Sequence, residues 1–146
     1  MKIAVLNGPN LNLLGSREPE LYGSATLADV EKRLREVAGE LRVDLEFAQH
    51  NGEGELIDFV HAMKGRVAGA VVNAGAYSHS SLALRDAFVG VAVPFVEIHI
   101  TNTFARERER RRSMLASAAV GVVCGLGVYG YELALRGLVA HLTRDG

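Results

Sequence analysis

The stretch that organises the chain runs from residue 3 to residue 23 and reads Ile3-Ala4-Val5-Leu6-Asn7-Gly8-Pro9-Asn10-Leu11-Asn12-Leu13-Leu14-Gly15-Ser16-Arg17-Glu18-Pro19-Glu20-Leu21-Tyr22-Gly23. It opens with a short run of apolar residues, which is typical of a buried strand. Gly8 and Pro9 follow closely, and these residue types end regular structure. We therefore expect a short inner strand at the start of the fold.

The rest of that stretch is a long connection. The next helix start that the sequence indicates is Thr26, whereas connections from a strand to a helix usually take about 2–6 residues. Residues 8–25 carry Asn10, Arg17 and Tyr22. A long loop with such groups favours a lid that closes over a substrate. The alternative is a mobile surface loop whose arginine and tyrosine are only solvated.

Beyond this connection, apolar runs alternate with amphipathic helical patterns. Thr26 and Asp29 have the spacing of a capping box at a helix start. Further helices are expected at residues 53–64, 82–89 and 129–142 after a first one at 26–41, and further strands at residues 45–48, 67–72, 94–100 and 120–123.

Two local features add to this outline. Ser80 or Ser81 is expected to cap the helix that follows them. The dense charge run from Arg106 to Arg112 is expected to be helical, with Glu107 and Arg111 as a favourable pair four positions apart.

This alternation of strands and helices predicts an α/β fold. The strands are apolar almost throughout, which indicates a parallel sheet covered by helices on both faces. We expect a single domain over residues 1–146, a flavodoxin-like three-layer sandwich whose five-stranded parallel sheet has the order 2-1-3-4-5. In such a sheet a ligand binds outside the carboxyl ends of the strands, near the switch between the first and third.

The composition disfavours several classes of partner. The formal net charge is −1, so bulk electrostatics provide no attraction for nucleic acid. The single Cys124 excludes an internal disulfide and fits a reducing compartment such as the cytoplasm, where we expect it to be a small buried hydrophobe. Glycines interrupt the uncharged stretch 113–131, so we expect no membrane span there. The opening apolar run is too short for a secretory leader.

Polar and titratable residues gather where the expected strands end. Asn10 follows the first strand, Asn73 and His79 follow the third, and Glu97 and His99 close the fourth. Each of them alone has an ordinary explanation as a turn, capping or solvated residue. Glu97 and His99 are two positions apart on a strand and therefore share a face. A carboxylate beside an imidazole fixes the tautomer of the ring, which suits proton transfer.

Three other kinds of site are disfavoured. The run from Gly125 to Gly130 matches a dinucleotide-binding pattern, but too few residues follow it for the strand and acidic residue that such a site needs. We expect its glycines to permit close packing of the last strand and helix. The spacing of His79, Glu97 and His99 matches no common metal-ligand pattern. The lysines fall away from the carboxyl ends, which disfavours an imine. We therefore expect neither a metal nor an organic cofactor.

A set of motifs is specific in combination. They are Asn7-Gly-Pro-Asn-Leu-Asn-Leu-Leu-Gly15, Arg17-Glu-Pro-Glu-Leu-Tyr22-Gly, Asn73-Ala-Gly-Ala-Tyr-Ser-His79, Glu97-Ile-His99 and Gly-Leu-Gly-Val-Tyr-Gly-Tyr131. With them the chain resembles the type II dehydroquinases (3-dehydroquinate dehydratases) over essentially its whole length. The resemblance implies removal of water from 3-dehydroquinate through an enolate to give 3-dehydroshikimate, without Schiff base or metal. It also implies a homo-oligomer, with trimers that pack into a dodecamer.

By position, the resemblance also implies a role for each site residue. Tyr22 resembles the family's proton acceptor and His99 its proton donor. Arg17 resembles the residue that stabilises the tyrosinate, and Asn10 the residue that helps to hold a water at the enolate oxygen. The implied substrate contacts are Asn73, His79, Ile100, Thr101 and Arg110, with Asp86 supplied by a neighbouring subunit and Glu97 in support.

The chain departs from the family pattern in places. Thr101 stands where serine is usual, and Phe104 stands where histidine is common. Within the run of arginines, Arg106 and Arg111 remain alternatives to Arg110 as the substrate contact. A non-catalytic binding module and a lyase for a related cyclic keto acid remain alternative functions. Aromatic amino acid biosynthesis and quinate catabolism both remain open as the pathway.

Overall fold

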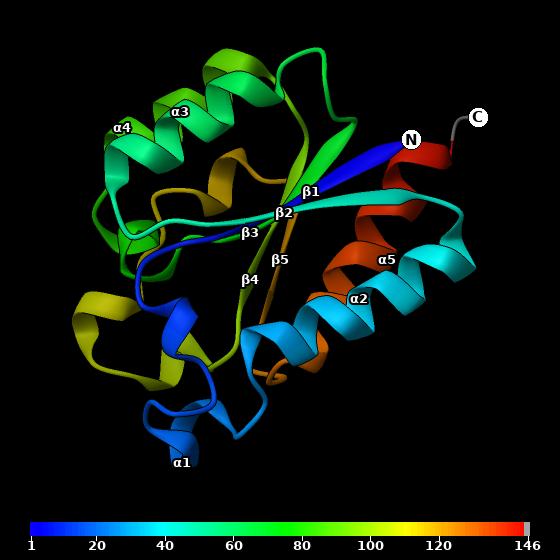
Figure 1. The fold of residues 1–146 in the computed structure, drawn as a ribbon. Coiled ribbons are helices and arrows are strands. Elements are labelled where there is room, and N and C mark those ends of the chain that lie inside the picture. The colour runs from blue at the N-terminus through cyan, green and yellow to red at the C-terminus, as the bar shows by residue number, and fades with distance from the viewer. Residues whose placement is uncertain (145–146) are drawn as a thin grey trace.

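Five strands form one parallel sheet in the order β2-β1-β3-β4-β5 in the computed structural model, which describes residues 1–144. The strands are β1 (Lys2–Asn7), β2 (Asp44–Gln49), β3 (Gly69–Asn73), β4 (Phe95–His99) and β5 (Gly121–Cys124). Figure 1 shows α2 (Leu27–Leu41) and α5 (Tyr129–Thr143) on one face of the sheet, and α3 (Glu53–Met63) and α4 (Leu82–Val91) on the other. The predicted α/β fold and strand order are confirmed.

The alternation of side chains along β1 supplies both halves of the core. Ile3 and Val5 pack with residues of α2 and α5, whereas Ala4 and Leu6 pack with residues of α3 and α4. Each of the four is at most 1% exposed. Because both faces of the sheet are covered, the strand is apolar at consecutive positions, and this was the pattern that indicated a parallel sheet.

The register of the sheet brings the carboxyl ends of the strands together. Asn7 of β1 pairs with Gln49 of β2 and with Asn73 of β3, and His99 of β4 pairs with Cys124 of β5. The polar strand ends therefore meet at one edge of the sheet. Cys124 is half-buried rather than buried, because β5 is an edge strand.

The connection over residues 8–25 holds more regular structure than the sequence indicated. A 3-10 turn spans Leu11–Leu13, and a short helix, α1, spans Pro19–Tyr22. The expectation that no helix begins before Thr26 was therefore wrong. Pro19 occupies the first helical position, where its missing N–H costs nothing. A single turn is too short to show apolar periodicity in the sequence.

The charge run from Arg106 to Arg112 is not the helix that the sequence predicted. Within this run, regular structure is limited to a 3-10 turn over Arg108–Arg110. Glu107 pairs with Arg110 and not with Arg111. The run contains no apolar residue to pack on the sheet. Short helices gain most of their stability from such a face, so the charges alone do not sustain one.

Two local predictions about helix caps are confirmed, and one about close packing holds at a single glycine. Thr26 and Asp29 form a reciprocal capping box at the start of α2. Ser81 is the residue that caps α4. Of the glycines expected to permit close packing, Gly130 does so, because a Cβ atom there would lie 3.2 Å from Cδ1 of Ile98; a Cβ atom at Gly127 would meet nothing within 4 Å.

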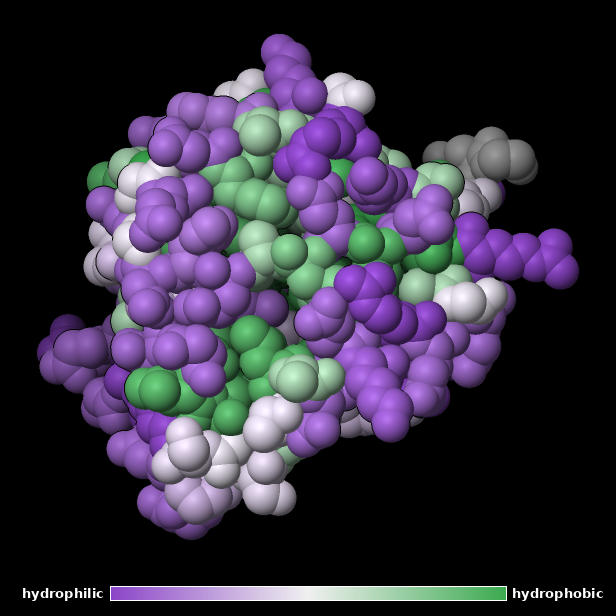
Figure 2. All heavy atoms as spheres, in the orientation of Figure 1, coloured by the Kyte–Doolittle hydropathy of each residue, from purple (hydrophilic) through white to green (hydrophobic). Residues whose placement is uncertain are grey.

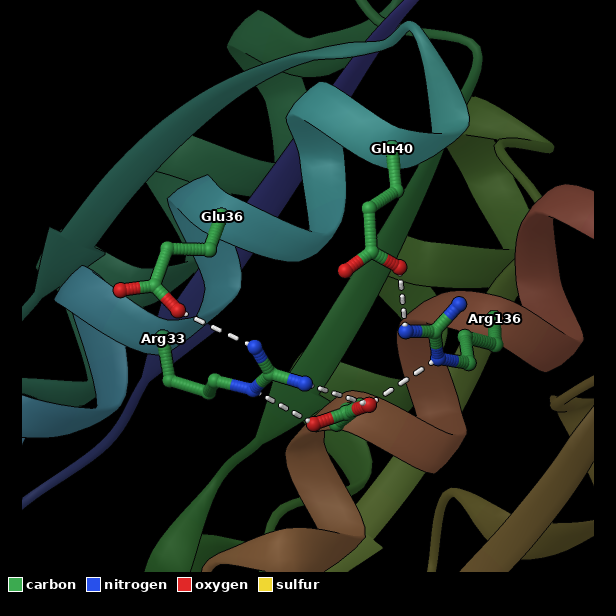
Figure 3. A network of polar contacts seen from close by, with 5 residues as sticks. Arg33, Glu36, Glu40 and Arg136 are labelled. Carbon is green, nitrogen blue, oxygen red and sulfur yellow. Dashed lines mark hydrogen bonds and ion pairs between the residues drawn. The ribbon is translucent and has the colours of Figure 1, made fainter.

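A network of ion pairs joins α2 and α5. Glu132 accepts hydrogen bonds from Arg33 (2.9 Å) and Arg136 (3.1 Å), and its side chain is 7% exposed. Figure 3 shows Arg136 of α5 facing Glu40 of α2, to which it donates at 2.7 Å, and Arg33 paired with Glu36 along α2. The hydrogen bond from Arg33 holds the pKa of Glu132 below its usual range, and Arg136 adds to this effect.

The face formed by α2, β2 and α3 is largely hydrophilic in Figure 2. A hydrophobic cluster on this face lies over the 3-10 turn of the 8–25 connection. Leu13 of this turn is 45% exposed. Across residues 1–144, no helix has both the length and the apolar character that crossing a bilayer requires.

Candidate active site

A cavity of ≈ 110 Å³ opens at the carboxyl edge of the sheet, where the connections after β1, β3 and β4 meet. Most of the predicted site residues line it, namely Asn10, Arg17, Tyr22, Asn73, His79, His99, Ile100, Thr101 and Arg110. Glu97 lies on β4 behind His99 and is fully buried. Asp86 lies on the exposed face of α4 and does not line this cavity.

Glu97 and His99 form a buried pair on β4. His99 Nε2 is hydrogen-bonded to Oε2 of Glu97, and the two residues are 7% and 0% exposed. The prediction that they share a face of the strand is confirmed. Because Nε2 is held by the carboxylate, Nδ1 is the ring nitrogen left for a substrate in the cavity.

The imidazole of His79 stacks on that of His99, with ring centroids 5.8 Å apart and an interplanar angle of 22°. His79 Nδ1 donates a 2.8 Å hydrogen bond to the carbonyl oxygen of Arg112, which leaves Nε2 as an acceptor. Burial lowers the pKa of His79, and the charges of His99 and Arg110 lower it further, against the effect of the Arg112 carbonyl. His79 is therefore a neutral acceptor suited to a hydroxyl group.

Two guanidinium groups surround the phenol of Tyr22. The Cζ atoms of Arg17 and Arg106 lie 4.9 Å and 5.5 Å from its ring centroid. Arg106 Nη1 donates to the Tyr22 hydroxyl oxygen at 2.8 Å and to Oγ1 of Thr101 at 3.4 Å. The sequence suggested Arg17 for the tyrosine and Arg106 only as an alternative substrate contact. Two positive charges therefore lie beside the Tyr22 ring.

Much of the Asn73 side chain is used by the fold itself. The Tyr131 hydroxyl donates to Oδ1 of Asn7 at 2.6 Å and accepts from Nδ2 of Asn73 at 2.9 Å. Oδ1 of Asn73 accepts from the N–H of Gly75 at 3.2 Å. The second N–H of the Asn73 amide is left for a substrate. Tyr131 is 1% exposed, and this burial raises its pKa.

Close backbone contacts hold the start of the 8–25 connection at the cavity. A Cβ atom at Gly8 would lie 2.4 Å from the carbonyl oxygen of Ala74, so only glycine fits there. Asn10 has a left-handed backbone with φ 69°, which asparagine tolerates. Its N–H donates to Oδ1 of Asn51 at 3.0 Å. These contacts place Asn10 at the cavity without using its side chain.

The chemical character of the lining suits a small polar anion. Arg17, Arg106 and Arg110 supply positive charge, and no lysine contributes to the lining. Over the part of the chain that the structure describes, no three His, Cys, Asp or Glu side chains are placed to hold a metal ion together. The cavity can bind a carboxylate, accept one proton and donate another.

Residues 1–139 match the family model described as dehydroquinase class II. The chain belongs to this family. A 3-dehydroquinate dehydratase of Gemmatimonas aurantiaca is 63% identical over 142 residues, which are 97% of this chain and 93% of that protein. One of Synechococcus sp. (strain WH7803) is 56% identical over 142 residues, 97% of each chain. The crystal structure of a type II dehydroquinase from Propionibacterium acnes has a TM-score of 0.90 at 41% identity, covering 95% of this chain and 96% of that one.

The resemblance expected from the motifs is thus confirmed. As a class II dehydroquinase the protein is an enzyme, which sets aside the non-catalytic binding module. The sequence did not identify Ser113, which contacts Glu97, or the role of Tyr131. Tyr131 did end one of the quoted motifs, whereas nothing in the sequence around Ser113 connects it to the site.

Proposed function

We propose that this dehydroquinase removes water from 3-dehydroquinate to give 3-dehydroshikimate through an enolate. The relatives from Gemmatimonas and Synechococcus carry the name 3-dehydroquinate dehydratase. The observation that carries the proposal is that Tyr22, between two guanidinium groups, and His99, held by Glu97, line the same cavity. An elimination of water needs one group to take a proton and another to give one.

The proposed course assigns each proton to a named atom. The Tyr22 phenolate takes a proton from the carbon next to the ketone, and the electron pair of that C–H bond moves to the ketone oxygen as an enolate. A water held near Asn10 stabilises this oxygen. When the enolate collapses, the C–O bond to the neighbouring hydroxyl breaks. His99 gives its Nδ1 proton to the departing oxygen, and Glu97 stabilises the charged ring before that step.

The proposed route involves neither an imine nor a metal. Every lysine of the chain lies outside the cavity lining, which supports a route without an imine. Positively charged and hydrogen-bonding groups then bind the substrate directly. The proposed binding residues are Asn73, His79, Ile100, Thr101 and Arg110.

A second copy of the chain completes the proposed site. Asp86 lies on α4 between Leu82 and Val89, two hydrophobic residues that are 60% and 58% exposed. All three share one helix face, which suits a contact between subunits. In the proposed homo-oligomer, trimers assembled into a dodecamer, this face brings Asp86 to a neighbour's cavity.

We assign the enzyme to the cytoplasm, in aromatic amino acid biosynthesis or quinate catabolism.

The test is the ultraviolet absorbance of the conjugated enone product after purified protein is mixed with 3-dehydroquinate. We expect a rise with wild type and none with Tyr22→Phe. Tyr129→Phe is the matched control, because Tyr129 is 57% exposed on α5. A rise with both wild type and Tyr22→Phe would keep the function and remove Tyr22 as proton acceptor. No rise with folded wild type would favour a related cyclic keto acid as substrate.

A further inference from the structure

The partners around the hydroxyl of Ser113 leave a single acceptor for its proton. Ser113 Oγ accepts hydrogen bonds from the backbone N–H groups of Leu115 (3.0 Å) and Ala116 (3.1 Å). It also lies 2.8 Å and 2.9 Å from the two carboxylate oxygens of Glu97. A hydroxyl has one proton and two acceptor lone pairs, and the backbone groups occupy both lone pairs. Its proton therefore goes to Glu97.

This contact favours the ionised form of Glu97. The carboxyl group is fully buried between Ser113 and His99. A protonated carboxyl could donate only to His99 Nε2, because Ser113 Oγ has no lone pair to spare. An ionised carboxylate instead accepts from both neighbours, and buried charge is tolerated when it is hydrogen-bonded in this way. Ser113 thus holds Glu97 as an acceptor for the proton on His99 Nε2.

The backbone around Ser113 also touches the second imidazole. The Arg112 carbonyl accepts from His79 Nδ1 at 2.8 Å, and the Met114 N–H donates to the Ser78 carbonyl at 2.7 Å. The segment 112–114 therefore fixes one nitrogen of each stacked ring, His79 through its backbone and His99 through Glu97. The proton positions on both rings therefore depend on the placement of this one segment.

We propose that Ser113 is a positioning residue for the acid of the elimination, whose hydroxyl proton keeps Glu97 ionised and His99 protonated at Nε2. The inference rests on the proposed function for its kinetic effect. When the hydroxyl is removed, one side of the buried carboxylate loses its donor. The proton on His99 Nε2 then shifts toward Glu97, and the ring becomes a poorer proton donor at Nδ1.

Ser113→Thr and Ser113→Val form the matched pair, because they have nearly the same shape and only threonine keeps the hydroxyl. Turnover of 3-dehydroquinate is measured for both. We expect kcat of Ser113→Val to fall about tenfold, part of the ~10²–10⁴ that a general acid contributes. We expect Ser113→Thr to stay within about threefold of wild type, and KM of both to change little.

A double-mutant cycle separates this role from support of the turn alone. In a Glu97→Gln background, Ser113→Val should cost little further kcat, because both changes break the same chain of contacts. An equal fall in kcat with and without Glu97 would overturn the proposal. So would a rise in KM with unchanged kcat, or equal losses in the threonine and valine variants.

A readout that does not involve turnover is the ¹⁵N NMR spectrum of labelled histidine. We expect the Nε2 proton of His99 in wild type and Ser113→Thr, and its loss or exchange in Ser113→Val. Identical His99 spectra for all three proteins would overturn the role of Ser113. An inactive wild type with the expected spectra would instead refute the proposed function and leave the role of Ser113 in place.

Discussion

Tyr131→Phe removes one oxygen atom from the centre of the molecule and should destabilise it strongly. The hydroxyl bonds to Asn7 at 2.6 Å and to Asn73 at 2.9 Å, and these residues are 2% and 4% exposed. Without it, the Asn7 Oδ1 acceptor and one Asn73 N–H donor stay buried without that partner. At about 1.5 kcal/mol for each orphaned group, the free energy of unfolding should fall by about 3 kcal/mol.

Urea denaturation followed by far-ultraviolet circular dichroism measures this loss. For a chain of this size, about 3 kcal/mol corresponds to a melting temperature lower by roughly 6–12 °C. The dependence on urea should keep its slope, because the folded and unfolded surfaces do not change. Tyr129→Phe, at an exposed position two residues earlier, should change neither quantity. A loss below about 1 kcal/mol would refute the reasoning, because the two amides would then have other partners.

Two further predictions concern charged groups. Arg106→Ala should lower kcat about 100-fold with a smaller effect on KM. The reason is that a guanidinium close to a phenolate is worth several kcal/mol at an effective dielectric constant of about 20. Equal kcat values in this variant and in a variant of the exposed Arg108 would contradict the role of Arg106 at Tyr22. Glu132→Gln should lower the melting temperature by a few degrees at neutral pH. Because Arg33 lowers the pKa of Glu132 from its ordinary value of 4.5, the stabilisation is fully present above that value and is lost as the pH falls through the lowered pKa. Thermal melts of both proteins should therefore converge in acid, and a difference that grows toward low pH would contradict this account.

The sequence predicted the frame of the fold because its signals are local. The apolar run from Ile3 to Leu6 and the break at Gly8 define β1 without reference to any distant residue. The sequence predicted a loop where α1 forms, and it predicted a helix where the charge run after β4 forms only a 3-10 turn. Helix α1 is a single turn that begins at a proline, and it is too short to show a helical pattern. The charge run has residues compatible with a helix but no apolar face to pack on the sheet.

The site was predictable where a motif placed a residue at a strand end, as for His99 and Asn73. It was less predictable where a side chain approaches from another segment. Arg106 reaches Tyr22 across 84 positions and Ser113 reaches Glu97 across 16, through a loop without regular periodicity. Such contacts depend on how the loops cross after the sheet has formed, and no short-range pattern encodes that crossing.

The hydrogen bond between Tyr131 and Asn7 joins the first strand to the last helix across 124 positions. A nascent chain on the ribosome can pair β1 with β2 and β3 long before α5 is synthesised. Until α5 leaves the exit tunnel, Asn73 lacks the hydroxyl that orients its amide. The growing polypeptide therefore acquires its sheet early and the oriented Asn73 amide of the candidate active site only at the end of translation. Premature termination before Tyr129 should leave a sheet fragment whose α5-facing side is uncovered and whose Asn73 amide lacks its partner hydroxyl.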